Sequence, residues 1–263
     1  MEALAVIAII AILLAIFLPA LNRAREASNR IKCAGNLRSI GQAIHLYIRD
    51  HTQFPRMRCD PYSSLEALFA TDDDTATYSD NHLKNNVTAG YYLLVRQGYV
   101  RAEMFLCPSA LREKTWIRDN GDPRTIRKYA DFTWARPCSS ILSYSFAIQY
   151  PNIHACPDYR PPPNQPGDFA VGADANSGMT AGVRPDSRRE LVRRANSHNH
   201  RWEGQNVLYM DGHVSWQSTS FCGHDGDCIY RGGIASPWVQ GVHDTVLLPE
   251  RNMWEMADGP ISW

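Results

Sequence analysis

The sequence lacks the short motifs that mark the commonest catalytic and nucleotide-binding sites. It contains no G-x-S-x-G turn, no P-loop, no G-x-G-x-x-G and no H-E-x-x-H. It also lacks a charge excess, because 27 Lys and Arg balance 27 Asp and Glu, so no global attraction to nucleic acid is expected. The sequence therefore predicts neither an enzyme nor a nucleic-acid-binding protein.

Charged side chains are almost missing from the first 21 residues, where Glu2 is the single ionisable group. Residues 3–21 form a run of 19 apolar residues. A helix of this length, at ~1.5 Å per residue, spans roughly 28 Å, about the hydrocarbon thickness of a bilayer. A cleavable secretory signal fits poorly, since it starts with basic residues and has a shorter apolar segment. A plain membrane anchor leaves Glu2 unexplained, because a carboxylate beside an apolar helix is costly.

Beyond residue 21 the pattern changes to apolar residues that recur every three or four positions. These residues are Ala24, Ala27, Ile31, Ala34, Leu37, Ile40, Ile44 and Tyr47. Charged and polar residues lie between them, which predicts an amphipathic continuation over residues 22–50 with one buried stripe. The whole helix is expected to be roughly 70 Å long, and Pro19 is expected to loosen or kink it. Such a helix suits a subunit whose first half packs against copies of itself.

Residues 51–263 are predicted to form a loop-rich globular head. Pro55 and Pro61 end the long helix, and short helices are expected at 63–70 and from residue 89 to Gly98. Residues 141–150 and 168–176 are predicted strands. The expected fold class is α+β, with an antiparallel sheet packed on the second half of the long helix.

The clearest hairpin lies in the segment NVLYMDGHVSW at 206–216. Asp211-Gly212 predicts a two-residue type I′ turn. In that register Tyr209 pairs with Val214, and Val207 pairs with Trp216. These four side chains would share one apolar face against the long helix.

Cysteine is present seven times, but no CxxC pair with zinc-ligand spacing occurs. Wide spacing in a chain with an export-type N-terminus favours disulfides in an oxidising compartment. Cys222 and Cys228 form the best local pair, and Cys33 and Cys107 are further disulfide candidates. The alternative is that several cysteines are simply buried thiols.

A polar group near the C-terminal half offers metal ligands. His198, His200, Asp211 and His213 could hold a transition metal, with Asp174 in the vicinity. The favoured interpretation is structural, with Asp211 in a turn and the histidines bonded to backbone. Asp225 and Asp227 flank a glycine, as in some calcium loops, but lack the later Glu of an EF-hand. No cofactor is predicted beyond these alternatives.

The segment from Glu2 to Tyr47 resembles the N-terminal helix of type IV pilins and type II secretion pseudopilins. More narrowly, the chain resembles large pilin-like proteins with a prepilin-type N-terminus and an H-x9-DG motif. RIKCAGNLRSIGQAIHLY is similar to their Cys-x-x-Asn-Leu segment and MFLCPSA to their Cys-Pro-Ser segment. HRWEGQNVLYMDGHVSW is similar to their C-terminal signature, with ten residues in place of nine between His200 and Asp211.

This resemblance implies a filament subunit whose helices pack into a core beneath a surface of heads. It implies that the Glu2 carboxylate meets the N-terminal amine of a neighbouring subunit, and that Pro19 marks a locally melted or bent helix. It also implies assembly machinery and a prepilin peptidase as partners. Pseudopilins of the secretion type often hold calcium in a C-terminal loop, which bears on Asp225 and Asp227.

The expected location is a single-pass inner-membrane protein that becomes part of an extracellular filament. Basic residues follow the apolar run and none precedes it, which by the positive-inside rule alone places the head in the cytoplasm. We expect a basic leader encoded upstream of Met1 to reverse this orientation. Two alternatives remain: a pseudopilin of a periplasmic secretion piston, and a membrane-anchored metal-binding sensor or enzyme.

Overall fold

The computed structural model describes residues 2–56, 87–110, 142–150, 162–180, 182–231 and 242–248, with side chains from residue 6 onward. Its elements are α1 (Glu2–His51), α2 (Val87–Arg96), η3 (Ala102–Phe105), β1 (Tyr144–Ala147), β2 (Ala170–Asp174), α5 (Arg189–Arg194), η5 (His198–His200), β3 (Gln205–Tyr209), β4 (Val214–Gln217), η6 (His224–Gly226) and β5 (Leu247–Leu248). The predicted α+β fold is confirmed. The helix predicted at 63–70 lies outside the described residues.

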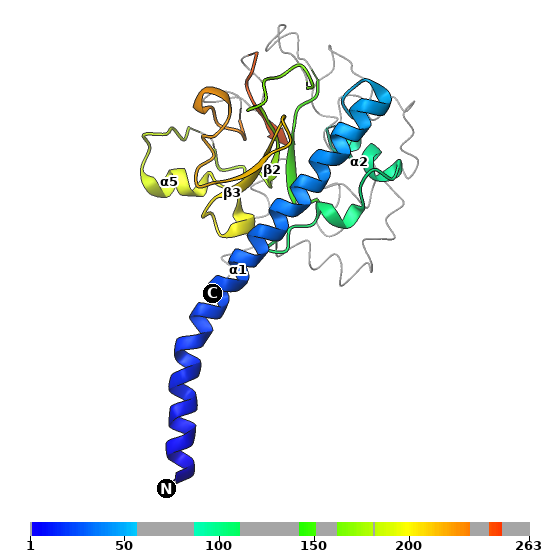
Figure 1. Cartoon of the computed structure of the whole chain (residues 1–263). Coiled ribbons are helices and arrows are strands. Elements are labelled where there is room, and N and C mark those ends of the chain that lie inside the picture. Colours follow the sequence, from blue (N-terminus) through cyan, green and yellow to red (C-terminus); the bar gives the residue numbers. More distant parts are fainter. Residues whose placement is uncertain are drawn as a thin grey trace, which may run out of the picture.

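One helix, α1, dominates the molecule and runs without interruption through Pro19. Figure 1 shows its first half projecting away from the head and its second half crossing the face of the sheet. The predicted long helix is therefore confirmed, and its end at His51 is one residue beyond the predicted range. At ~1.5 Å per residue its 50 residues give a length of roughly 75 Å.

The described strands form an antiparallel sheet in the order β4-β3-β2-β1-β5. The predicted strand segments 141–150 and 168–176 are confirmed at their centres, as β1 and β2. Both strands are buried along their whole length, because α1 and α2 pack onto this part of the sheet. The predicted helix ending at Gly98 is also confirmed, as α2, and Gly98 has a φ of +78° just after it.

The hairpin β3–β4 differs from the predicted register by one residue. Leu208 pairs with Val214, and Asn206 pairs with Trp216. The connection is a three-residue loop, in which the Gly212 amide donates to the Tyr209 carbonyl at 2.9 Å and Gly212 adopts a φ of +88°. A type I′ turn needs positive φ at both central residues, and Asp211 is not among the described positive-φ residues. Asp211 and Gly212 are thus the last two residues of a type I turn that begins at Tyr209, and Gly212 adopts the left-handed conformation.

This shift changes which side chains face the helix. Because side chains alternate along a strand, a slip of one residue turns the side chains of β3 to the other face, while Val214 and Trp216 of β4 stay on the predicted one. The face toward α1 carries Asn206, Leu208, Val214 and Trp216, with Leu208 against Gly41 and Trp216 beneath Arg30. Tyr209 lies on the opposite face, where its hydroxyl donates to the Cys222 carbonyl at 3.1 Å. The prediction that Val207 and Tyr209 face the helix is therefore wrong.

The buried stripe of α1 begins later than predicted. Its buried members are Cys33, Leu37, Ile40, Gly41, Ala43, Ile44 and Tyr47. Ala24, Ala27 and Ile31 are exposed, contrary to the prediction. Ile31 is on the side of the helix turned away from the head, since at 3.6 residues per turn it lies about 120° around the helix axis from Leu37, whereas Cys33 lies about 40° from it.

Candidate functional site

The free half of α1 is an apolar surface exposed on all sides. Its large apolar side chains, each about half or more exposed, are Val6, Ile7, Ile9, Ile10, Ile12, Leu13, Leu14, Ile16, Phe17, Leu18 and Leu21. Among the described residues this is the one helix long and apolar enough to cross a membrane. The side chain of Glu2 lies outside the described ones. The arrangement can serve insertion in lipid or packing against other apolar helices.

A second feature is buried where α1 meets the head. The side chains of Cys33, Cys107, Asp174 and His200 are all buried, and one ligand atom from each lies within 4.8 Å of the others. They come from four separate segments: α1, the turn after η3, the end of β2 and η5. Thiol, carboxylate and imidazole groups are the common ligands of transition metals. This set is the only such group of three or more residues in the described part of the chain.

His200 is the centre of the cluster. Its Nε2 lies 3.7 Å from the Cys107 sulfur and 3.3 Å from Asp174 Oδ2. Its Nδ1 lies 2.6 Å from Glu26 Oε1 on α1. Both ring nitrogens are therefore engaged, and the imidazole is held between the sheet and the long helix.

Further hydrogen bonds hold the two carboxylates in place. Asp174 Oδ2 accepts from the Asn206 backbone amide at 2.7 Å, and Oδ1 accepts from Asn199 Nδ2 at 3.4 Å. Glu26 accepts from the Ser109 hydroxyl at 2.8 Å and lies 3.8 Å from Arg30. A buried carboxylate is costly unless it is paired and hydrogen-bonded, and both conditions are met for Asp174.

The electrostatics of the cluster follow from burial and from the Asp174 charge. Burial lowers the pKa of His200, but the charge and hydrogen bond of Asp174 outweigh this and raise the pKa to about 11. Burial, followed by the neighbouring Cys33, raises the pKa of the Cys107 thiol well above its ordinary value. In the absence of a bound cation, His200 is therefore an imidazolium and Cys107 is a neutral thiol.

The structure separates the four residues that the sequence suggested as a metal set. His200 enters the buried cluster, whereas Asp211 and His213 pair at the exposed end of the hairpin, 2.5 Å apart. His213 also stacks on Tyr209, with ring centroids 4.4 Å apart. His198 starts η5, and no metal-binding group in the described part of the chain includes it. Of the predicted residues, His200 and the nearby Asp174 come together.

The other predicted sites are placed around η6. The Asp225 side chain is 93% exposed and lies 3.8 Å from His224, whereas Asp227 accepts from the Thr245 amide. Neither belongs to a group of potential metal ligands among the described residues. Cys222 and Cys228 are thiols here, as are Cys33 and Cys107, so the disulfides stay a prediction.

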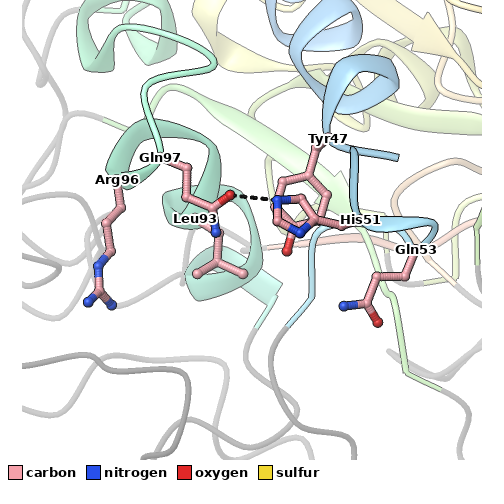
Figure 2. A pocket seen from close by; sticks show the side chains of 6 residues that line it. All are labelled: Tyr47, His51, Gln53, Leu93, Arg96 and Gln97. Carbon is pink, nitrogen blue, oxygen red and sulfur yellow. Dashed lines mark hydrogen bonds between the residues drawn. The ribbon is translucent and has the colours of Figure 1, made fainter. Parts of the chain in front are cut away.

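A pocket lies at the junction of α1 and α2, lined by Tyr47, His51, Gln53, Leu93, Arg96 and Gln97. Figure 2 shows His51 and Gln97 joined across it by a hydrogen bond, which is 2.9 Å long, while Arg96 points away from this pair. Tyr47 packs on His51, with ring centroids 4.3 Å apart. These contacts tie the end of the long helix to α2, and the pocket contains no group of potential metal ligands among the described residues.

Sequence reasoning missed the buried cluster as a unit. Cys33 and Cys107 were singled out for their sulfur, and His200 for its place in the C-terminal motif, but no spacing rule connects them. Glu26 carried no signal beyond its place among the polar residues of an amphipathic helix. One feature of the sequence does point to the cluster. Cys33, Cys107 and His200 each lie in a different one of the three motifs that carry the family resemblance.

The comparisons with known proteins found a match over part of the chain. No curated protein and no solved structure matches it. A family model described as "Protein of unknown function (DUF1559)" matches residues 22–146. The matched stretch begins inside α1 and ends in β1, so it contains Cys33 and Cys107 and stops before Asp174 and His200. Over this stretch the chain is similar to that family.

Proposed function

We propose that this chain is a structural subunit of a type IV pilus-like filament that polymerises through α1. The observation that carries the proposal is the division of α1 into two halves. The second half is part of the core of the head, whereas the first half is exposed and apolar on every side. A helix of this kind allows a folded head to be anchored in a membrane and then packed into a filament through the helix.

The energetics exclude a free helix in water. Burying one large aliphatic or aromatic side chain is worth about 1.5–3 kcal/mol. Eleven such side chains are exposed between Val6 and Leu21, and their sum rivals the roughly 5–15 kcal/mol that stabilise a whole domain. The free half must therefore be covered by lipid or by other helices. Within lipid, association depends on helix packing and polar contacts rather than on further apolar burial.

The N-terminal resemblance supplies the rest of the proposal. Glu2 provides the polar contact, through the N-terminal amine of the neighbouring subunit, because an unpaired carboxylate among apolar helices is costly. The subunit acts as a building element and not as an enzyme. Its partners are other copies of the chain, the membrane before assembly, a prepilin peptidase and the assembly machinery.

The proposal is tested by locating the assembled protein. Cell-surface material is sheared off, examined by electron microscopy and labelled with an antibody against the head. Fibres that carry the label are expected. Labelled short fibres confined to the periplasm would instead identify a secretion pseudopilin, and a protein that stays monomeric in the membrane and after detergent removal would overturn the proposal.

A pair of matched variants connects the fibres to α1. Leu13 on the free half is 49% exposed, and Leu191 on α5 of the head is 46% exposed. Leu13→Asn is expected to abolish fibres while the protein still fractionates with membranes, because the substitution disturbs helix packing. Leu191→Asn is expected to leave fibres unchanged. Equal fibre yields from both variants would show that the free half of α1 is not the assembly surface.

A further inference from the structure

We propose that Cys33, Cys107, Asp174 and His200 bind one zinc ion, which fastens the long helix to the head. The four ligand atoms come from the helix and from three segments of the head, and each side chain is buried. The proposed site is distinct from the exposed half of α1. It concerns how the subunit is held together, not how it polymerises.

Two of the distances between ligand atoms match those of a tetrahedral site. Zinc bonds of about 2.3 Å to sulfur and about 2.0–2.2 Å to nitrogen or oxygen place sulfur and nitrogen about 3.5 Å apart on a tetrahedron. The same bond lengths place nitrogen and oxygen about 3.3 Å apart. The corresponding distances here are 3.7 Å from Cys107 Sγ to His200 Nε2 and 3.3 Å from His200 Nε2 to Asp174 Oδ2.

The surroundings of the ligands match those of a metal centre. A histidine that ligates a metal through one nitrogen usually donates its other N–H to a carboxylate, which fixes the ring and its tautomer. His200 has this arrangement, with Nε2 toward the cluster and Nδ1 2.6 Å from Glu26 Oε1. Asp174 is oriented by the Asn206 amide. Ligands and supporting groups are therefore already in place.

Two other interpretations account for only part of the cluster. A salt bridge of protonated His200 with Asp174 and Glu26 does not explain why two thiols lie beside it. A disulfide between Cys33 and Cys107 does not explain why a buried carboxylate and an imidazole nitrogen lie within 4.8 Å of the same sulfurs. A single zinc ion uses all four groups, and its two positive charges offset two of the three negative charges of the thiolates and the Asp174 carboxylate.

Four protein ligands leave no open coordination position, which is the mark of a structural zinc site. The ion would join residue 33 of the helix to residues 107, 174 and 200 of the head. Because a preformed site does not exist in the unfolded chain, binding contributes directly to folding. In a filament, a force applied to the head would be carried to the helix partly through this site.

The test uses the full chain, purified in detergent and analysed for metals by mass spectrometry. One zinc per chain is expected, and it should be removed by a strong chelator and restored by zinc alone. Replacement by cobalt should produce thiolate-to-cobalt charge-transfer absorption and the visible bands of tetrahedral cobalt. Less than stoichiometric zinc after reconstitution, or a cobalt spectrum without the thiolate absorption, would overturn the proposal.

Matched cysteine variants locate the site. Cys33→Ser and Cys107→Ser are expected to lose the stoichiometric zinc, whereas Cys228→Ser, at another buried cysteine, should retain it. Glu26→Gln is a variant of a positioning residue and should weaken zinc binding about 10–100-fold without removing the thiolate absorption. If the cysteine variants fail to fold, the cobalt spectrum of the unmodified chain still decides the outcome.

The alternative to the zinc site is a disulfide between Cys33 and Cys107, and thiol mapping detects it. Cells are lysed in an alkylating reagent without reductant, and the peptides are analysed by mass spectrometry. Recovery of alkylated Cys33 and Cys107 after denaturation in chelator supports the zinc site. Recovery of a Cys33–Cys107 cross-linked peptide as the main species would overturn it.

Discussion

Glu26 and His200 are separated by 174 positions in the sequence, yet Glu26 Oε1 lies 2.6 Å from His200 Nδ1. This contact joins the long helix to the C-terminal part of the head through two ionisable groups. The helix is thus an integral part of the head's polar interior as well as of its apolar core.

Glu26→Gln is expected to destabilise the head. The variant removes the charge of the Glu26 carboxylate that accepts from His200 Nδ1, and a hydrogen bond to a charged group is worth about 1.5–3 kcal/mol in proteins. The measurement is chemical unfolding of the full chain in detergent, followed by tryptophan fluorescence. Glu190→Gln is the control, since the ion pairs of Glu190 with Arg193 and Arg194 are exposed and therefore contribute little to stability. Equal unfolding midpoints for both variants would contradict the structural role of Glu26.

Two truncations test where the head begins. A chain of residues 22–263 removes only the exposed part of α1 and is expected to fold as a soluble monomer. A chain of residues 52–263 also loses Leu37, Ile40, Ile44 and Tyr47, which are at most 3% exposed. At about 1.5–3 kcal/mol for each side chain, this loss matches the stability of a typical domain. Circular dichroism and gel filtration should show only the longer chain folded.

Gly41 and Gly35 provide a matched pair on the same helix. A Cβ at position 41 would lie 2.8 Å from Leu208 Cδ1, whereas one at position 35 meets nothing within 4 Å. Gly35→Ala should stabilise the chain by up to about 1 kcal/mol, the difference in helix propensity. Gly41→Ala should gain less or lose stability, because Leu208 must move within a packed core. Unfolding midpoints that rise equally would refute the close contact.

The pair formed by His224 and Asp168 predicts that the stability of the folded state depends on pH. The hydrogen bond to Asp168, at 2.9 Å, raises the pKa of His224 above its ordinary value. The folded state therefore gains from the charged pair below the ordinary histidine pKa, and this gain is lost as the pH rises through the raised pKa. An NMR titration should show His224 deprotonating at higher pH than a free histidine.

Asp168→Asn is expected to return the His224 titration toward the ordinary range. A His224 midpoint that is the same in the unmodified chain and in Asp168→Asn would show that the pair does not exist in solution.

Local patterns predicted the parts of the fold that depend on local forces. The 3.6-residue period around Leu37, Ile40 and Ile44 was enough to place one side of α1 against a core. The apolar run before it was enough to predict a helix that needs lipid or other helices. The burial of Cys33 and the exposure of Ile31 were not predicted, because the pattern does not reveal which side of the helix the head covers between Glu26 and Leu37.

The turn residues alone did not determine the register of the β3–β4 hairpin. Asp211-Gly212 correctly located the connection between β3 and β4, but the same two residues are compatible with a two-residue and a three-residue loop. The choice depends on whether Leu208 or Tyr209 packs against Gly41, which is a property of the helix surface and not of the hairpin. Packing selected Leu208, so the side chains of β3 lie on the face opposite to the predicted one, whereas Val214 and Trp216 of β4 keep the predicted face.

The sequence by itself determined a long helix with an apolar first half, a loop-rich α+β head and the position of its central strands, because periodicity and turn residues act over a few positions. Only the tertiary structure decided that Cys33, Cys107, Asp174 and His200 meet. Their approach results from folding α1 and three distant segments around one core. A ligand set gathered over such separations leaves no spacing in the sequence, since contacts between distant segments are set by packing rather than by chain position.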